Sequence, residues 1–304
     1  MFRQLPKALA GEEEAVHQMR VAGRRLRVAL ALLARKPKGR RVRRALRVLR
    51  ELTRAAGASR DLDVSVDLFD ERLKSPAPPT TPEQAKLRRR LRAAQRRSRT
   101  RMAEALMDLE IARLRRDLRA ILSRRADDPF RILRRVRDAR DEEGEALLAG
   151  LEGIGDRYDP DGLHRLRGRA RRLRYTAEVS DALRGRDSDA PTLFKKVQEL
   201  VGLVHDHHVL AAWLEAQAAA AARGNGSLAT EAEAQAAFFE ETSRACHRGF
   251  LEQRPIELIR QALEALGQTR LAAVLPHDAK RTAPETPSSD GAMTIPLRSR
   301  PEAS

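Results

Sequence analysis

The chain has 304 residues, of which 41% are hydrophobic and only 3% aromatic, and its formal net charge is +17. So few aromatic side chains argue against a β-sandwich or β-barrel and favour packed helices with a core of Leu, Ala, Val and Ile. The single cysteine, Cys246, excludes an intrachain disulfide. The excess of positive charge indicates an anionic partner.

Helical periodicity runs almost throughout the chain, and strand-like alternation is nearly absent. The sequence therefore predicts an all-α fold. The predicted helices cover 12–35, 38–56, 60–74, 83–124 with a break near 107, 128–153, 160–185, 190–222 with a bend near 203, 228–250 and 255–267. The proline-rich stretch 74–83 predicts a loop, because proline cannot continue a helix.

The stretch "GIGDRYDPDG" at 153–162 separates the chain into two helical halves, which we predict to be residues 1–157 and 158–275. Residues 276–304 are polar and rich in Pro, Ser and Thr, which predicts a disordered tail. Residues 158–304 carry equal numbers of basic and acidic side chains, so the whole excess of positive charge lies in the first half.

Two motifs occur twice, in the same order. "HQMRVAGRRLR" begins at His17 and "HRLRGRARRLR" at His164, and both read H-x-x-R-x-x-x-R-R-L-R. "GASRDLDV" then begins at Gly57 and "GLVHDHHV" at Gly202, which share G-x-x-[RH]-D-x-[DH]-V. The repetition predicts a duplicated unit.

At about 100° per residue, each copy of the first motif places one histidine and three arginines on a single helix face. The residues on these two faces are His17, Arg20, Arg24 and Arg27 in the first copy, and His164, Arg167, Arg171 and Arg174 in the second. Apolar residues such as Met19 and Leu30 form the opposite, core-facing stripe, and Arg25 belongs to neither face. Two equivalent basic faces are therefore expected.

The same arginine spacing recurs in two further stripes, Arg40, Arg43, Arg47, Arg50 and Arg54, and Arg89, Arg92, Arg96 and Arg99. Like charges at this spacing repel by about 0.2 to 0.5 kcal/mol per pair, which suggests that a bound polyanion offsets the cost. A solvated helix face is the alternative, and for the stripe at 89–99 both interpretations stay open.

These motifs resemble those of the CHAD-domain family, through "VHQMRVAGRRLR", "LHRLRGRARRLRY", "GASRDLDV" and "LVGLVHDHHVL", and the resemblance covers roughly residues 5–275. It implies two four-helix bundles related by a pseudo-twofold, with a central basic channel. It further implies binding of inorganic polyphosphate, association with polyphosphate granules and no catalysis by the domain. The second half carries fewer basic residues outside its motif, so the channel is expected to be lopsided.

The candidate polyphosphate-binding residues are His17, Arg20, Arg24, Arg27, Arg43, Arg47, Arg50, Arg89, Arg92, Arg96, His164, Arg167, Arg171, Arg174, Lys195 and His205. Arginine suits phosphate because its planar guanidinium donates two hydrogen bonds at once and stays charged. Asp61, Asp63 and Asp206 are expected to cap helices or orient arginines rather than bind metal.

Two other functions stay open at this point. Stripes of arginine also suit nucleic acid, although aromatic side chains for base stacking are scarce, so weak nonspecific nucleic-acid binding is a possible side activity. The sequence "HDHH" at 205–208 offers a His/Asp cluster for a metal-dependent phosphohydrolase, but no Walker loop or HExxH motif accompanies it. We expect no cofactor, no catalysis, no membrane segment and a cytoplasmic location.

Overall fold

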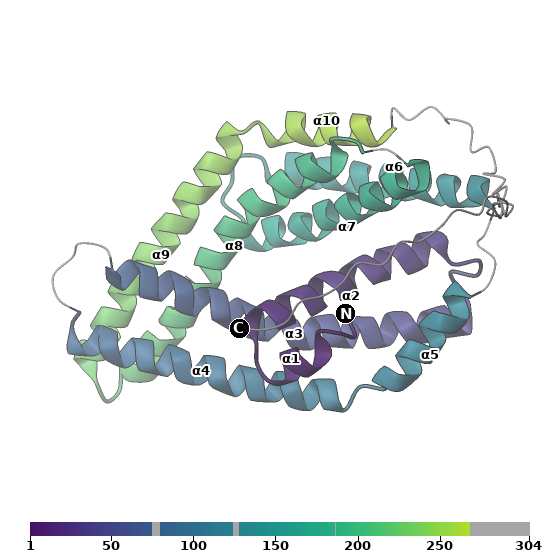
Figure 1. The fold of residues 1–304 in the computed structure, drawn as a ribbon. Helices are drawn as coiled ribbons and strands as arrows, with labels where there is room; N and C mark the ends of the chain where they lie inside the picture. Colours follow the sequence, from purple (N-terminus) through teal and green to yellow (C-terminus); the bar gives the residue numbers. More distant parts are fainter. Residues whose placement is uncertain (75–79, 124–127, 186, 268–304) are drawn as a thin grey trace, which may run out of the picture. The chain divides into compact units, whose positions relative to one another are not determined.

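The computed structural model describes residues 1–74, 80–123, 128–185 and 187–267, and these residues form ten helices and no strand (Figure 1). The prediction of an all-α fold is confirmed. In chain order the helices are α1 (Leu5–Leu9), α2 (Glu13–Leu33), α3 (Arg40–Lys74), α4 (Pro82–Met107), α5 (Ile111–Leu122), α6 (Pro129–Ile154), α7 (Pro160–Arg184), α8 (Ala190–Ala221), α9 (Gly226–Glu252) and α10 (Pro255–Gly267).

Local sequence signals account for several helix ends. At the start of α4, Thr81 accepts the backbone N–H of Gln84, and the side chain of Gln84 accepts the N–H of Thr81, a reciprocal capping box. At the start of α7, Asp159 accepts the N–H of Gly162. Gly185 ends α7 with φ of 63°, a left-handed conformation that glycine adopts without a steric penalty.

One predicted helix break was wrong, one helix was missed and another predicted break was confirmed. The helices expected at 38–56 and 60–74 are one continuous α3, because a glycine inside a helix costs only about 1 kcal/mol and the surrounding residues Leu52, Ala56 and Ser59 are buried. The short α1 was not predicted, since five residues are too few to show periodicity. The break near residue 107 is present between α4 and α5.

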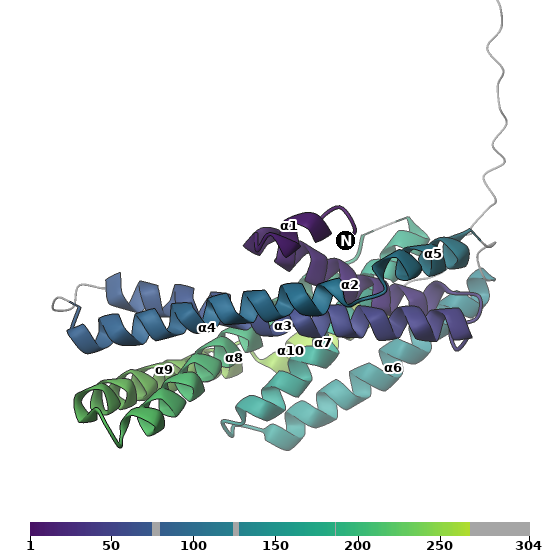
Figure 2. The same cartoon turned by 90° about the horizontal axis from the view of Figure 1, so that it is seen from below.

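The core consists mainly of Leu, Ala, Val and Ile, as the composition predicted. One apolar cluster joins α6, α7, α8 and α10 to the end of α9, with Phe194 of α8 and Phe250 of α9 at 0% and 1% exposure. Another joins the C-terminal part of α3 and the N-terminal part of α4 to α8 and α9, through residues such as Phe69 and Phe239. Both views show α8 and α9 beside α3 and α4 (Figures 1 and 2).

The two motif-bearing helices, α2 and α7, pack against each other. The pairs α3 with α8 and α4 with α9 are also in contact. The element order repeats, because α1 to α5 and α6 to α10 carry their motifs on the second and third helix of each set. The pseudo-twofold relation itself stays a prediction.

The predicted division between residues 157 and 158 also stays a prediction. It would assign α6 to the first half, whereas Leu147 and Leu151 of α6 belong to the core that α7, α8 and α10 form. The predicted tail at 276–304 lies outside the described residues. Within the described part of the chain, no helix combines the length and apolarity needed to cross a bilayer.

Candidate anion-binding site

Helices α2 and α7 bring four arginines together, two from each copy of the repeated motif. We call Arg20, Arg24, Arg167 and Arg171 the central arginine cluster. The side chains of Arg20 and Arg167 are only 15% and 20% exposed. The positive charge of Arg167 on α7 acts on both Arg20 and Arg24 of α2, and the charge of Arg171 also acts on Arg24.

Burial and mutual repulsion shift the pKa values in this cluster. Desolvation, followed by the positive charges of Arg20 and Arg171, lowers the pKa of Arg24 to about 9. Desolvation and the neighbouring Arg167 lower the pKa of Arg171 to about 10. Both side chains remain charged at neutral pH, so the cluster holds positive charge that the protein only partly compensates.

Two carboxylates face the cluster from equivalent positions of the second motif. Arg20 Nη2 lies 3.6 Å from Asp61 Oδ1, and Arg167 Nη1 lies 3.7 Å from Asp206 Oδ1. Both aspartates thus pair with arginines, and Asp63 likewise accepts a hydrogen bond from Arg99 at 2.8 Å. Their role in orienting the arginines stays a prediction. Burial raises the pKa of Asp206, and the nearby Asp61 raises it further.

Some donors of the cluster have no acceptor. The Nε atoms of Arg20 and Arg167 are buried and lack a hydrogen-bond partner among the described residues. Buried polar groups without a partner are rare, because each costs free energy of desolvation that no hydrogen bond returns. Unpaired donors on two equivalent arginines indicate a site that accepts hydrogen-bonding anionic groups.

Three histidines, His17, His164 and His205, lie next to the cluster, and their lowered pKa values favour the neutral ring at neutral pH. The Nδ1 atoms of His164 and His205 lie 3.1 Å apart, so one ring donates and the other accepts. Desolvation, His164 and Arg167 lower the pKa of His205 to about 3. Desolvation also lowers the pKa of His17 and of His164, and nearby arginines lower it further. A bound polyanion would oppose these shifts.

A cavity of about 430 Å³ opens beside the cluster, between α2, α3, α6 and α7. Arg24 and Arg171 of the cluster line it, and Arg27 and Arg50 add two further cations from α2 and α3. We call this space the first cavity. Arg27 also approaches the hydroxyl of Thr53, at 3.5 Å. The predicted residues Arg27 and Arg50 are therefore brought next to the cluster.

Other predicted arginines have intramolecular partners. Arg174 pairs with Glu178 at 3.2 Å on α7, and Arg25 of α2 donates two hydrogen bonds, of 2.7 and 3.0 Å, to the same carboxylate. Glu178 thus links α2 to α7. The equivalent residue of Arg25 in the second copy, Arg172, donates two hydrogen bonds to Glu143 of α6.

Several predicted residues lie elsewhere. Arg89, Arg92 and Arg96 are exposed on α4, which packs against α3, α9 and α1, and Arg92 donates to Asp70. Lys195 is exposed on α8 and pairs with Glu199 at 3.3 Å. The structure does not bring these four side chains to the central arginine cluster. Arg43 and Arg47 are exposed along α3.

Sequence reasoning missed Arg60. Its positive charge acts on His17, Arg20 and Asp206, which places it at the cluster. The signal was present, because Arg60 occupies the same motif position in "GASRDLDV" as His205 does in "GLVHDHHV". His205 was predicted as a site residue and its repeat partner was not.

Gly202 of α8 lies directly beside the cluster. A Cβ added there would lie 3.2 Å from Nη2 of Arg167, closer than an ordinary contact. The missing side chain therefore allows the guanidinium to pack against α8. The paired Gly57 of α3 has nothing within 4 Å of the same position, so only one of the two repeated glycines makes room for an arginine.

The "HDHH" residues point to different partners. His205 contacts His164, His207 Nδ1 lies 2.8 Å from the carbonyl of Leu203, and His208 approaches Glu240 at 3.4 Å. Across the ranges that the structure describes, no group of three or more His, Cys, Asp or Glu side chains is arranged to hold a metal ion.

A family model of the CHAD domain matches residues 1–215. Two proteins from strains of Mycobacterium tuberculosis, both called uncharacterized, are each 33% identical over 222 residues, which cover 68% of this chain and 41% of the relative. The chain thus spans less than half the length of these curated relatives. The crystal structure of the CHAD domain from the plant Ricinus communis has a similar fold, with a TM-score of 0.55 and 22% identity, over 87% of this chain and 86% of that one.

Proposed function

The chain belongs to the CHAD-domain family, and we propose that it binds inorganic polyphosphate at the central arginine cluster and in the first cavity. The observation that carries the proposal is the meeting of two equivalent arginine pairs, in each of which one arginine, Arg20 or Arg167, has a buried Nε atom without an acceptor among the described residues. The two carboxylates beside them do not balance four guanidinium charges, so the site favours an added anion with several negative charges.

The geometry suits a flexible phosphate chain. Arg20 and Arg24 lie one helical turn apart, about 6 Å along α2, and Arg167 and Arg171 have the same spacing on α7. Each guanidinium can donate two parallel hydrogen bonds to phosphate oxygens. Arg27 and Arg50 continue the row of donors into the first cavity. A polymer without bases needs little beyond such closely spaced donors.

We extend the proposal to the cellular role. The domain binds polyphosphate without hydrolysing it and associates with polyphosphate granules in the cytoplasm. Weak nonspecific binding to nucleic acid is a side activity of the same arginines, since the phosphate backbone presents the same charged oxygens.

A binding titration with long-chain polyphosphate at near-physiological salt tests the proposal. The double variants R20Q/R24Q and R167Q/R171Q each remove one side of the cluster and should weaken binding by roughly a hundredfold or more, since hydrogen bonds to charged groups contribute about 1.5 to 3 kcal/mol each and two arginines are lost. The control R97Q/R101Q removes two exposed charges of α4 and should bind like the wild type. Equal affinity of all three variants would contradict the proposal.

Two further measurements separate the alternatives. In a competition between polyphosphate and duplex DNA, a stronger preference for DNA would favour nucleic-acid binding as the main function. In an incubation of the protein with polyphosphate and a divalent metal ion, release of orthophosphate would favour a metal-dependent phosphohydrolase. The proposal expects neither result.

A further inference from the structure

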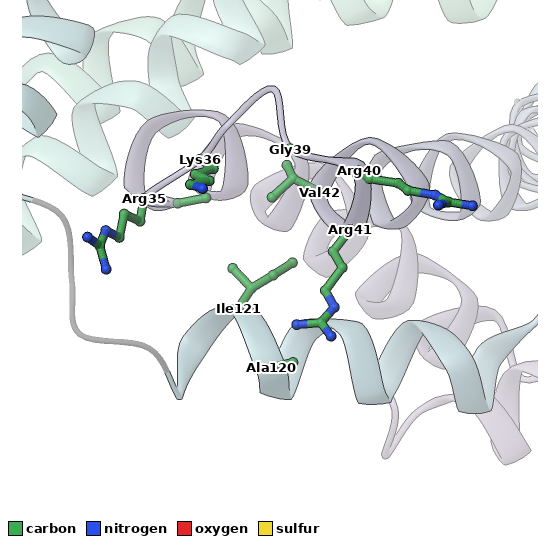
Figure 3. Close-up of a pocket in the computed structure, with 9 residues that line it drawn as sticks. Arg35, Lys36, Gly39, Arg40, Arg41, Val42, Ala120 and Ile121 are labelled. Carbon is green, nitrogen blue, oxygen red and sulfur yellow. The ribbon is translucent and has the colours of Figure 1, made fainter.

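A second basic cavity, of about 250 Å³, lies at the turn between α2 and α3, against α5 (Figure 3). Four cations line it: Arg35 and Lys36 from the turn, and Arg40 and Arg41 from the first turn of α3. Its floor is apolar, with Ile121 of α5 among the lining residues. Figure 3 shows Arg41 reaching toward α5, whereas Arg40 points away from the other labelled side chains.

The four cations that line this second cavity lack ion-pair partners in the part of the chain that the structure describes, whereas nearby arginines outside the lining are hydrogen-bonded. Across the described residues, none of the four lining cations has a carboxylate within ion-pair distance. Outside the lining, Arg44 donates two hydrogen bonds of 2.6 Å to Asp117, which ties α3 to α5. Arg135 of α6 donates to the carbonyls of Leu32 and Ala34, at 2.9 and 3.1 Å, which holds the end of α2. The helices around the cavity are held by internal bonds, and the carboxylate of Asp117, whose negative charge interacts with Arg41, is already bonded to Arg44.

A stripe of arginines connects the two cavities. Arg50 lines the first cavity and Arg40 lines the second. Arg43 and Arg47 lie between them, exposed and within about 80° of the same helix face. The segment 40–50 contains no acidic residue. The distance along α3 from Arg50 to Arg40 is about 15 Å.

We propose that a long polyphosphate chain leaves the central arginine cluster through the first cavity, follows Arg50, Arg47 and Arg43 along α3, and enters the second cavity as an exit subsite. This inference rests on the proposed function and adds a dependence on chain length. A short phosphate such as tripolyphosphate occupies the central cluster alone, whereas a long chain contacts the cluster, the stripe and the second cavity together.

The triple variant R35A/K36A/R41A tests the exit subsite. Its matched control is R97A/R101A/R223A, which removes the same charge from exposed positions that line neither cavity. Each protein is titrated with long-chain polyphosphate and with tripolyphosphate over a range of salt concentrations. Circular dichroism and thermal unfolding verify that both variants are folded.

The proposal expects the triple variant to bind long-chain polyphosphate at least about tenfold more weakly than the control. The slope of log affinity against log salt should become shallower by about two, since each contact to a flexible phosphate strand contributes about 0.7. Tripolyphosphate should bind both variants equally. As a direct check, long-chain polyphosphate should protect Lys36 from acetylation, and tripolyphosphate should not.

Two results would overturn the exit subsite and leave the proposed function standing: long-chain binding that matches the control, or an equal loss for both ligands. A wild type that binds neither ligand would overturn the exit subsite and the proposed function together.

Discussion

Asp61 and Asp206 place negative charge inside a site that we propose for a polyanion. Each faces one arginine of the central cluster, at 3.6 and 3.7 Å, and the arrangement is the same in both copies of the motif. The carboxylates reduce repulsion among the buried arginines when the site holds no anion. The carboxylates also repel a bound anion, so they lower the affinity for a short phosphate.

The variant D206N should bind long-chain polyphosphate about three- to tenfold more tightly than the wild type at neutral pH, because one repelling charge is removed at short range. D138N, which removes an exposed carboxylate paired with Arg134 on α6, is the control and should have no effect. A D206N affinity at or below that of the wild type would show that Asp206 positions Arg167 more than it repels the ligand.

The pH dependence of binding follows from the same residue. Because the pKa of Asp206 is raised, its carboxyl takes up a proton at a higher pH than an ordinary aspartate does, and binding should strengthen as this proton is taken up. His17 and His164 have lowered pKa values, so they gain positive charge at a lower pH than an ordinary histidine does. A titration series in which D206N retains the full pH dependence of the wild type would contradict this assignment.

At the scale of the helices, the packing of α8 against α7 decides where one arginine lies. Gly202 allows Arg167 to rest on α8, whereas the equivalent Gly57 of α3 has open space around it. The two positions are related by the repeated motif, so they form a matched pair for substitution.

G202A should displace the guanidinium of Arg167 and weaken polyphosphate binding several-fold. G57A should leave binding unchanged and stabilise α3 by about 1 kcal/mol, because alanine has the higher helix propensity, which corresponds to a rise in Tm of roughly 2 to 4 °C. Binding titrations and thermal unfolding of both variants measure these effects. Equal binding by the two variants would mean that the contact at Gly202 does not position Arg167.

At the scale of the whole chain, the cores depend on helices beyond the matched family region. The CHAD-domain model ends at residue 215, yet α9 and α10 contribute Phe239, Phe250 and Ile259 to two of the apolar clusters. The family match therefore covers less than the folded unit that the structure describes.

A chain that ends after Ala221 lacks α9 and α10, exposes the apolar faces of α8 and should not unfold cooperatively, because several large side chains lose their burial. A chain that ends after Gly267 keeps all ten described helices and should unfold like the full chain. Calorimetry of the two truncated proteins makes the comparison. A cooperative transition in the shorter protein would show that α9 and α10 are dispensable for the core.

The sequence by itself determined the helical class, most helix boundaries, and the shared face of Arg20 and Arg24 with its repeat at Arg167 and Arg171. These are local properties, because spacings of three, four and seven residues decide which side chains share a helix face. The repeat even contained the signal for Arg60, through its equivalence to His205.

Tertiary structure decided which of the basic faces meet and which arginines have internal partners. Arg25 and Arg174 share Glu178, and Arg92 donates to Asp70. Among the described residues, Arg20 and Arg167 of the central cluster keep unpaired Nε donors. Helical periodicity predicts the i,i+4 pair of Arg174 with Glu178 but not the bonds of Arg25 and Arg92, because their partners lie on other helices. The continuity of α3 through Gly57 also depended on packing, since burial of its neighbours outweighs the small local cost of glycine in a helix.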